Sequence, residues 1–353
     1  MAPNLLKQAY PWIKTPLIIG APMRLISLAP LAVEASRAGG IGFIGSGTDT
    51  SNLEHILQHA QSLLSAHPIP NSPTTTLPIG IGFINWGASL PIALPLIARF
   101  KPAAVWFFAP SSLTSLVEWT TATRAASPAT KIWIQIGSVA AALEVTTACR
   151  PDVLVVQGTD AGGHGLVKGA GIVSLLPEVA DALANLGAEA PLLVAAGGIA
   201  EARGAAAALA LGADGVVIGT RMLASPEANI AAGYKREVVR ARDGGQTTVR
   251  TKVYDMVRGT TGWGKDYDGR AVVNRSFVDA GNGMWEEENK RLYEAEIEKG
   301  DDGWGVEGRM TTYAGAAVGL VTEIKGAADI VEEVREGTVR VLEGLKGEAK
   351  SKL

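Results

Sequence analysis

The sequence has a single cysteine, Cys149, and only four histidines among its 353 residues. One cysteine forms no intrachain disulfide and supplies no thiolate set for a zinc site. No HExxH segment pairs the histidines for a catalytic metal, no Gly-x-Ser-x-Gly segment offers a serine nucleophile, and no Walker A loop occurs. The sequence therefore predicts neither a metal site nor serine chemistry.

A large charge imbalance and long apolar runs are also missing. The chain has 32 Lys and Arg against 35 Asp and Glu, which argues against an electrostatic nucleic-acid binder. No apolar run approaches the ~18 residues of a membrane span. Residues 1–14 lack the apolar stretch of a secretory signal and contain Pro11. With 47% hydrophobic residues, the sequence is typical of an intracellular, enzyme-sized globular protein.

The length of the chain exceeds the ~250 residues of one (β/α)8 barrel, and its charges are unevenly distributed. Residues 1–224 contain 24 charged side chains, whereas residues 225–353 contain 43. The composition predicts a barrel over residues 1–225. It also predicts a mostly helical, more solvated C-terminal region over residues 226–353, packed on the barrel and a candidate contributor to the substrate pocket.

Eight short apolar runs alternate with Ala-rich or amphipathic segments in the first part. They lack polar alternation, as expected for parallel strands buried on both faces. They cover residues 17–21, 41–44, 79–84, 104–108, 132–136, 153–156, 192–195 and 215–218. Eight such units predict the α/β class and a TIM barrel, rather than an open doubly wound sheet.

In a barrel, reactive groups lie in the loops after the carboxyl ends of the strands. The loop after the sixth run, residues 157–165, places His164 among glycines. Histidine is suited to proton abstraction near neutral pH, so His164 is the candidate catalytic residue, with a purely structural histidine as the alternative. The other three histidines lie on or just after a predicted helix and are interpreted as surface residues: His55, His59 and His67.

Glycine and threonine follow the seventh and eighth runs, in residues 195–199 and 217–221. Loops at these two strands commonly form a phosphate site from backbone N–H groups. Together they predict a phosphate-bearing cofactor or substrate. Arg221 is interpreted as a surface cation, with an anion-binding role as the alternative.

Several motifs recur in an order that resembles the nitronate monooxygenase family, formerly called 2-nitropropane dioxygenases. The resemblance covers roughly residues 16–224 and continues more loosely through Arg270–Phe277 and Tyr313–Leu320. Its most specific member is Asp160–His164. The other motifs are Ala21–Met23, Ala38–Ile44, Gln157–Gly158, Ala195–Ile199, Gly212–Val216 and Gly219–Thr220.

The resemblance implies an FMN-dependent barrel that oxidises alkyl nitronates, or nitroalkanes, with O2 to a carbonyl compound and nitrite. It implies that His164 acts as a base on a nitroalkane or as a partner of an anionic nitronate. The residues that it places around the flavin ring are Ala21, Pro22, Met23, Gln157, Gly162 and Gly163. Those that it places at the FMN phosphate are Gly198, Gly219 and Thr220, and Gly197 is a further cofactor-binding candidate.

Two departures from the family pattern affect the site. Gly82 occupies a position where many bacterial members have Asn, so a hydrogen bond is missing or comes from Asn85 or Gln135; Gly82 and Gln135 both stay cofactor-site candidates. Arg24, after Met23, replaces a small residue and either narrows the site or offers a cation to an anionic substrate. The alternatives are an NAD(P)H-dependent flavin reductase, of the enoyl-acyl-carrier-protein or quinone reductase type, and a non-catalytic flavin-binding barrel.

The C-terminal part offers fewer indications. Residues 285–298 predict an amphipathic helix with Trp285, Leu292 and Ile297 facing inward. Three aromatic residues are interpreted as core, with a wall of the substrate pocket as the alternative: Trp263, Trp304 and Tyr313.

The last three residues, Ser351-Lys352-Leu353, match the peroxisomal address read by an import receptor. The sequence therefore predicts a peroxisomal protein. A frayed polar tail on a cytoplasmic protein is the alternative.

Overall fold

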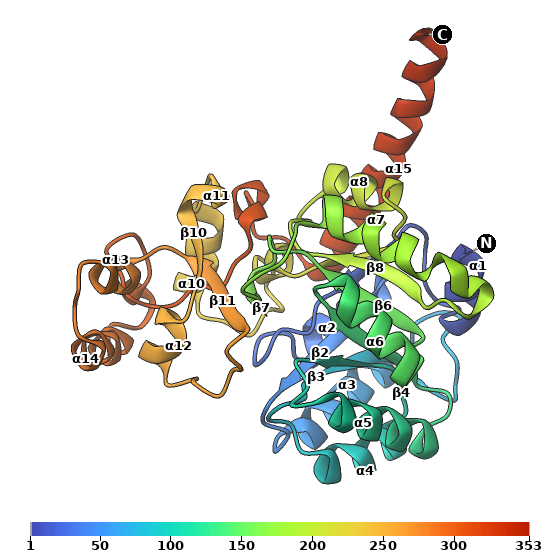
Figure 1. The fold of residues 1–353 in the computed structure, drawn as a ribbon, viewed down its shortest axis with the longest axis horizontal. Coiled ribbons are helices and arrows are strands. Elements are labelled where there is room, and N and C mark those ends of the chain that lie inside the picture. The colour runs from blue at the N-terminus through green and yellow to red at the C-terminus, as the bar shows by residue number, and fades with distance from the viewer. Residues whose placement is uncertain (1, 353) are drawn as a thin grey trace.

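The computed structural model describes residues 2–352, and its central feature is a closed barrel of eight parallel strands (Figure 1). Strand β9 pairs with β1 from Gly215 opposite Leu17 to Ile218 opposite Gly20, which closes the barrel. The strands are β1 Leu17–Gly20, β2 Ile41–Gly47, β3 Leu77–Ile84, β4 Pro102–Phe108, β5 Lys131–Ile136, β6 Val153–Gln157, β8 Leu192–Ala196 and β9 Gly215–Ile218. Each of the eight apolar runs forms one strand, so the predicted α/β barrel is confirmed.

Helices cover the outside of the barrel, and aromatic side chains fill its interior. Trp133 is fully buried and packs against both Phe43 and Trp106, and its indole Nε1 donates a 2.8 Å hydrogen bond to the hydroxyl of Tyr10. The helices are α1 Ala2–Ala9, α2 Ala29–Arg37, α3 Leu53–Ala66, α4 Leu90–Phe100, α5 Leu113–Ala126, α6 Val139–Cys149, α7 Ile172–Leu183, η1 Ala184–Glu189 and α8 Ala202–Ala210. The chain just after α1 therefore helps to fill the barrel.

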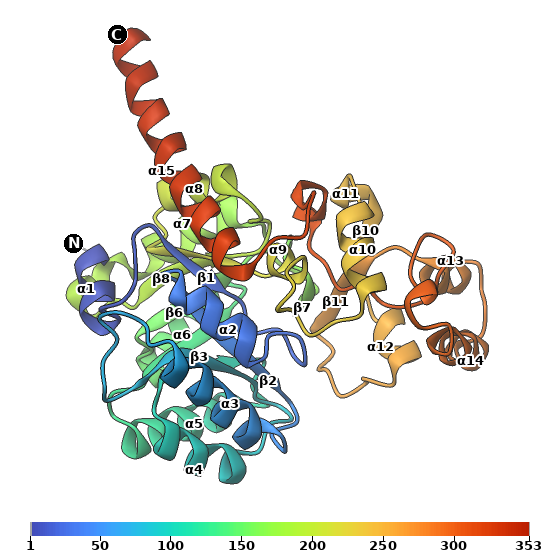
Figure 2. The ribbon, with the colours of Figure 1, turned by 180° about the vertical axis from the view of Figure 1, so that it is seen from behind.

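A second lobe lies beside the barrel (Figures 1 and 2). It contains two strands, β10 Thr248–Thr251 and β11 Tyr267–Val272, which form an antiparallel sheet with β7 Gly163–Leu166 in the order β10-β11-β7. The short helix α9 Thr220–Leu223 follows β9 at the end of the barrel. In the lobe, helices outnumber strands: α10 Ala232–Arg240, α11 Gly244–Thr247, α12 Val253–Arg258, α13 Arg275–Gly281, α14 Glu286–Ile297, η2 Gly300–Gly303 and η3 Ala316–Leu320. The loop expected to carry His164 is thus strand β7, which the lobe extends into a sheet.

The last helix, α15 Ala327–Lys352, returns to the barrel and lies along α8, α2 and β1, while its far end extends beyond them (Figure 2). Arg335 on this helix is buried and donates a 2.8 Å hydrogen bond to the carbonyl of Ala38. Helix α15 therefore packs with the barrel, and the division at residue 225 stays a prediction. Leu353, the end of the proposed import signal, lies outside the described residues.

The side of helix α14 that is buried in the lobe is not the side that its apolar residues predicted. Its buried side chains are Asn289, Tyr293 and Glu296, whereas Trp285 is 80% exposed and Ile297 is 49% exposed. Asn289 donates a 2.7 Å hydrogen bond to a backbone carbonyl of α13, which explains its inward position. The prediction was wrong for Trp285 and Ile297 because polar contacts orient this helix.

Among the helices of residues 2–352, none combines the length and the apolar character that a membrane crossing needs.

Candidate active site

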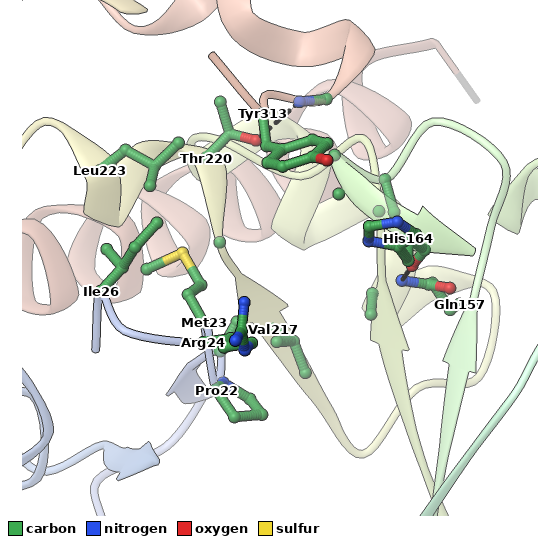
Figure 3. A pocket seen from close by; sticks show the side chains of 18 of the residues that line it. Pro22, Met23, Arg24, Ile26, Gln157, His164, Val217, Thr220, Leu223 and Tyr313 are labelled. Atoms are coloured by element: carbon green, nitrogen blue, oxygen red, sulfur yellow. Dashed lines mark hydrogen bonds between the residues drawn. The ribbon is translucent and has the colours of Figure 1, made fainter. Parts of the chain in front are cut away.

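A cavity of about 410 Å³ lies at the carboxyl ends of the barrel strands, between the barrel and the second lobe. In Figure 3, His164 and Gln157 lie on one side, Pro22, Met23 and Arg24 lie on another, and Tyr313 lies above. The cavity brings together nearly all of the residues that the sequence pointed to: Ala21, Pro22, Met23, Gln135, Gln157, Gly162, Gly163, His164, Gly197, Gly198, Gly219 and Thr220.

Gly82 is the exception, because it does not belong to the lining. A Cβ atom at this position would lie 2.3 Å from the Cβ of Pro22, so the absent side chain makes room for the proline. Asn85 is also apart from the cavity, and its side-chain oxygen accepts a 2.9 Å hydrogen bond from the backbone N–H of Phe108. Gln135 does line the cavity, and its Oε1 accepts from the indole of Trp106 at 2.9 Å.

His164 is paired with a buried carboxylate from the lobe. Both oxygens of Asp255, on α12, lie close to its Nε2, at 2.9 and 3.0 Å. Asp255 is 4% exposed, and its Oδ1 also accepts from the hydroxyls of Thr260 at 2.9 Å and Tyr313 at 3.2 Å. Sequence reasoning missed Asp255, which is 91 residues from His164 and lies in no recognisable motif.

Aromatic side chains enclose the histidine on its other sides. The ring of Trp263 stacks on the imidazole of His164, with centroids 3.7 Å apart and planes at 6°. The ring centroid of Tyr313 lies 5.5 Å from that of the imidazole, and Trp304 also lines the cavity. All three aromatic residues interpreted as core thus wall the cavity. Burial, together with the negative charge of Asp255, raises the pKa of Tyr313, so its phenol remains a donor at neutral pH.

Two lobe arginines hold the backbone of the segment before His164. The guanidinium of Arg250 donates to four carbonyls, at 2.6 Å to Asp268, 2.8 Å to Ala161, and 3.2 Å to both Gly163 and Thr159. Arg270 adds a bond of 3.2 Å from Nε to the carbonyl of Thr159. Burial lowers the pKa of Arg250 to about 10, which leaves it charged at neutral pH. Neither arginine's role was foreseen from the sequence.

Glycines shape the rest of the cavity in different ways. Gly197 and Gly198, after β8, have φ of +98° and +77°, values that favour glycine. A Cβ at Gly162 would lie 2.4 Å from the backbone nitrogen of Gly315, whereas one at Gly163 would meet nothing within 4 Å. Thus Gly162 allows the lobe to approach, and Gly163 leaves open space.

Thr220, a phosphate-site candidate, and two arginines are the other polar residues to which the sequence pointed. The Oγ1 of Thr220 accepts a 2.9 Å hydrogen bond from the N–H of Gly315, which again ties the lobe to the barrel. Arg24 lines the cavity, and its buried Nε has no hydrogen-bond partner within residues 2–352. Arg221 is not the surface cation expected from the sequence: it is 6% exposed and donates to the carbonyl of Glu323 at 3.0 Å. The three other histidines are exposed, as predicted.

A parallel barrel with a histidine–carboxylate pair in a cavity at the strand ends has the architecture of a barrel enzyme. The sequence profile described as "Nitronate monooxygenase" matches residues 119–337. Over 341 residues the chain is 47% identical to the nitronate monooxygenase npaC of Metarhizium robertsii, covering 96% of this chain and 95% of that protein. Over 348 residues it is 38% identical to a nitronate monooxygenase of Neurospora crassa, covering 93% and 90%. The chain belongs to the nitronate monooxygenase family and is an enzyme.

Solved structures agree on the fold. FabK from Thermotoga maritima superposes with a TM-score of 0.74 at 24% identity, over 98% of both chains. A nitroalkane oxidase from Streptomyces ansochromogenes superposes with a TM-score of 0.73 at 21% identity, over 96% of this chain and 99% of that one. At these identities the likeness concerns the fold.

Proposed function

We propose that this enzyme binds FMN in the cavity and oxidises alkyl nitronates, and the parent nitroalkanes, with O2 to a carbonyl compound and nitrite. The observation that carries the proposal is the placement of His164, held against Asp255 and Trp263 in the lining of the cavity. The full-length identity to two proteins named nitronate monooxygenase supports the choice of reaction.

The lining is chemically suited to a flavin phosphate. A volume of about 410 Å³ is within the range of small-molecule and cofactor sites. Pro22, Met23 and Val217 provide apolar surface for a planar ring, and Gln135 and Gln157 provide polar groups for its edge. The open space at Gly163 leaves room for a bound group, and the Nε of Arg24, which has no hydrogen-bond partner among the described residues, offers it a donor. Backbone at Gly197, Gly198, Gly219 and Thr220 would hold the phosphate.

Bound FMN would supply the redox chemistry, by taking electrons from the substrate and passing them to O2. The chain's own residues would orient the substrate and handle its proton. His164 would remove a proton from a neutral nitroalkane, or pair in its protonated form with an anionic nitronate. The walls formed by Trp263, Trp304 and Tyr313 would limit access of water to the reacting atoms.

The absorbance spectrum of the purified protein tests the cofactor. Flavin bands near one equivalent, with FMN released on denaturation, would support the proposal; a colourless protein that does not take up FMN would contradict it. Anaerobic addition of an alkyl nitronate should then bleach the flavin, and aerobic turnover should release nitrite. Bleaching by NAD(P)H but not by nitronate would instead indicate a flavin reductase, and bleaching by neither would indicate a binding protein.

Substitution of the histidine tests its part in turnover. His164→Asn should lower nitroalkane turnover by about 10²-fold or more while flavin remains bound, because general-base catalysis typically contributes 10²–10⁴-fold. His59→Asn is a matched control, since this histidine is exposed on α3, and its turnover should equal that of the wild type. Unchanged turnover in His164→Asn would remove the histidine from the mechanism.

We also propose a peroxisomal location, on the basis of Ser351-Lys352-Leu353. A fluorescent reporter that ends in the last residues of this chain should concentrate in peroxisomes. The same reporter without its final leucine should remain diffuse. A diffuse signal from both reporters would contradict the proposal.

A further inference from the structure

The proton on His164 has a defined position in this site. An ionised carboxylate only accepts hydrogen bonds, and both oxygens of Asp255 lie within 3.0 Å of Nε2 of the imidazole. The hydroxyls of Thr260 and Tyr313 donate to the same carboxylate, so three donors surround it in a buried position. Nε2 of His164 is therefore the nitrogen that carries hydrogen, and in the neutral ring Nδ1 holds the lone pair.

The rest of the imidazole is fixed in place, with Nδ1 left unpaired. Trp263 stacks on one face at 3.7 Å, and the main chain of His164 is held in β7 opposite Gly269 of β11. No side chain or backbone group of residues 2–352 hydrogen-bonds to Nδ1. Because His164 lines the cavity, this unpaired nitrogen is the one available to a ligand.

From this geometry, and resting on the function proposed above, we propose that Asp255 is a positioning residue that keeps the His164 proton on Nε2 and so makes Nδ1 the base for nitroalkanes. In the step, the α C–H bond breaks, its electron pair forms the C=N bond of the nitronate, and the π pair of one N=O bond moves onto that oxygen, which takes the negative charge. The proton goes to Nδ1, and the resulting imidazolium is stabilised by the Asp255 carboxylate. A substrate supplied as nitronate skips this step.

The other charged and titratable groups near His164 come from all the elements around it. Strand β11 contributes Tyr267, Asp268 and Arg270, and β10 contributes Arg250, whose guanidinium bonds the carbonyl of Gly163. Helix α12 contributes Arg258 beside the Tyr313 ring, 5.6 Å from its centroid. Among the described carboxylates, Asp255 alone forms an ion-pair contact with the imidazole, so its charge is the one to remove.

Asp255→Asn tests the inference by comparing two substrates. The amide is close in size to the carboxylate but can donate to Nε2, which would move the ring proton to Nδ1 and block the base. We expect kcat/KM for a nitroalkane to fall by about 10²-fold, whereas kcat/KM for the matching nitronate changes by less than about threefold.

A direct readout of the proton does not depend on activity. In the holoenzyme with ¹⁵N-labelled histidine, only four side chains contribute, and the His164 signal is the one that disappears in His164→Asn. The wild type should show the Nε2-protonated tautomer, Asp255→Asn should show a loss of that tautomer, and Asp255→Glu should retain it in part.

Two aspartates in the lobe provide matched controls. Asp266 is exposed in the segment that leads into β11, so Asp266→Asn should leave both substrates unchanged. Asp279 is buried against Arg309, so Asp279→Asn should lower the stability of the lobe without favouring one substrate over the other.

The outcomes separate this inference from the proposed function. Equal losses on both substrates in Asp255→Asn, with an unchanged tautomer, would overturn the inference and leave Asp255 a purely structural residue. A wild type that oxidises the nitronate but not the nitroalkane would also overturn it, while the nitronate oxidation of the proposed function would stand. A wild type that oxidises neither would refute the proposed function, and the tautomer measurement would still report whether Asp255 sets the proton on His164.

Discussion

Replacing Arg250 with methionine should loosen the strand that carries His164. Methionine keeps an unbranched apolar stem of similar length but offers no donor to the four carbonyls that the guanidinium contacts. Those carbonyls belong to residues 159–163 and to Asp268, so the substitution acts on the connection between barrel and lobe. The apolar contacts of the side chain should change little.

The size of the effect follows from the hydrogen-bond lengths. The bonds to Asp268 and Ala161, at 2.6 and 2.8 Å, are short, and each bond from a charged donor contributes about 1.5–3 kcal/mol. The two bonds of 3.2 Å contribute less, and the substitution removes the cost of burying the charge. We therefore expect a loss of about 3–5 kcal/mol, which for 353 residues corresponds to a decrease in Tm of about 5 °C.

Thermal unfolding and amide hydrogen exchange measure this loss. Exchange in residues 159–166 should accelerate by between about 100-fold and 4,000-fold, because 1.4 kcal/mol corresponds to a factor of ten in the opening equilibrium. Arg270→Met is the matched comparison, since Arg270 bonds the same loop only through Thr159 at 3.2 Å and otherwise donates to the hydroxyl of Thr248 at 3.2 Å. With two long bonds in place of four, two of them short, it should cost about 1–2 kcal/mol. Equal losses from the two arginines, or unchanged exchange in residues 159–166 of Arg250→Met, would refute the reasoning.

Further predictions concern the aromatic wall and the glycines. Tyr313→Phe removes a 3.2 Å hydrogen bond to Asp255 and should lower nitroalkane kcat/KM by about three- to tenfold in steady-state assays. Because burial and Asp255 raise the pKa of Tyr313 above its usual 10.0, this phenol should contribute no basic limb to the wild-type pH–rate profile below that pH. Gly162→Ala should lower the free energy of unfolding by about 2–3 kcal/mol in chemical denaturation, because its Cβ would clash with Gly315. Gly163→Ala should lower it by about 1 kcal/mol, because only its φ of +67° opposes a side chain. The reverse order of the two losses would contradict this assignment.

The barrel could be predicted from the sequence because its strands are buried on both faces. Residues 153–157, for example, form a continuous apolar run up to Gln157, where the strand reaches the cavity. The parallel arrangement then places all the following loops at one end, so His164 and the glycines after β8 could be assigned to a common site without any knowledge of their contacts. Local composition was sufficient for these features.

Packing in three dimensions explains what the sequence did not predict. Gly82 lies on β3, and Pro22 occupies the space that a side chain at position 82 would need. The spacing of residues in the sequence does not reveal such a limit on side-chain volume. The apolar residues of helix α14 predicted which of its sides is buried. The hydrogen bond from Asn289 to α13 instead turns the side with Asn289 inward. In both cases, a contact between distant segments outweighs the local pattern.

The charge-dense second part was interpreted as a solvated layer, yet several of its charges are buried at the most constrained points of the molecule. Asp255 accepts from three donors, and Asp279 pairs with Arg309, each with a carboxylate less than a tenth exposed. His164 lies on β7, in the loop that follows barrel strand β6. The lobe holds it in place through strand β11, which pairs with β7, and through the carboxylate of Asp255 and the guanidinium of Arg250. Buried polar groups need hydrogen-bond or ion-pair partners, and the barrel segment has few charged side chains to provide them. A charge-rich segment after an aliphatic barrel is therefore a place to look for the partners of a polar residue in the site.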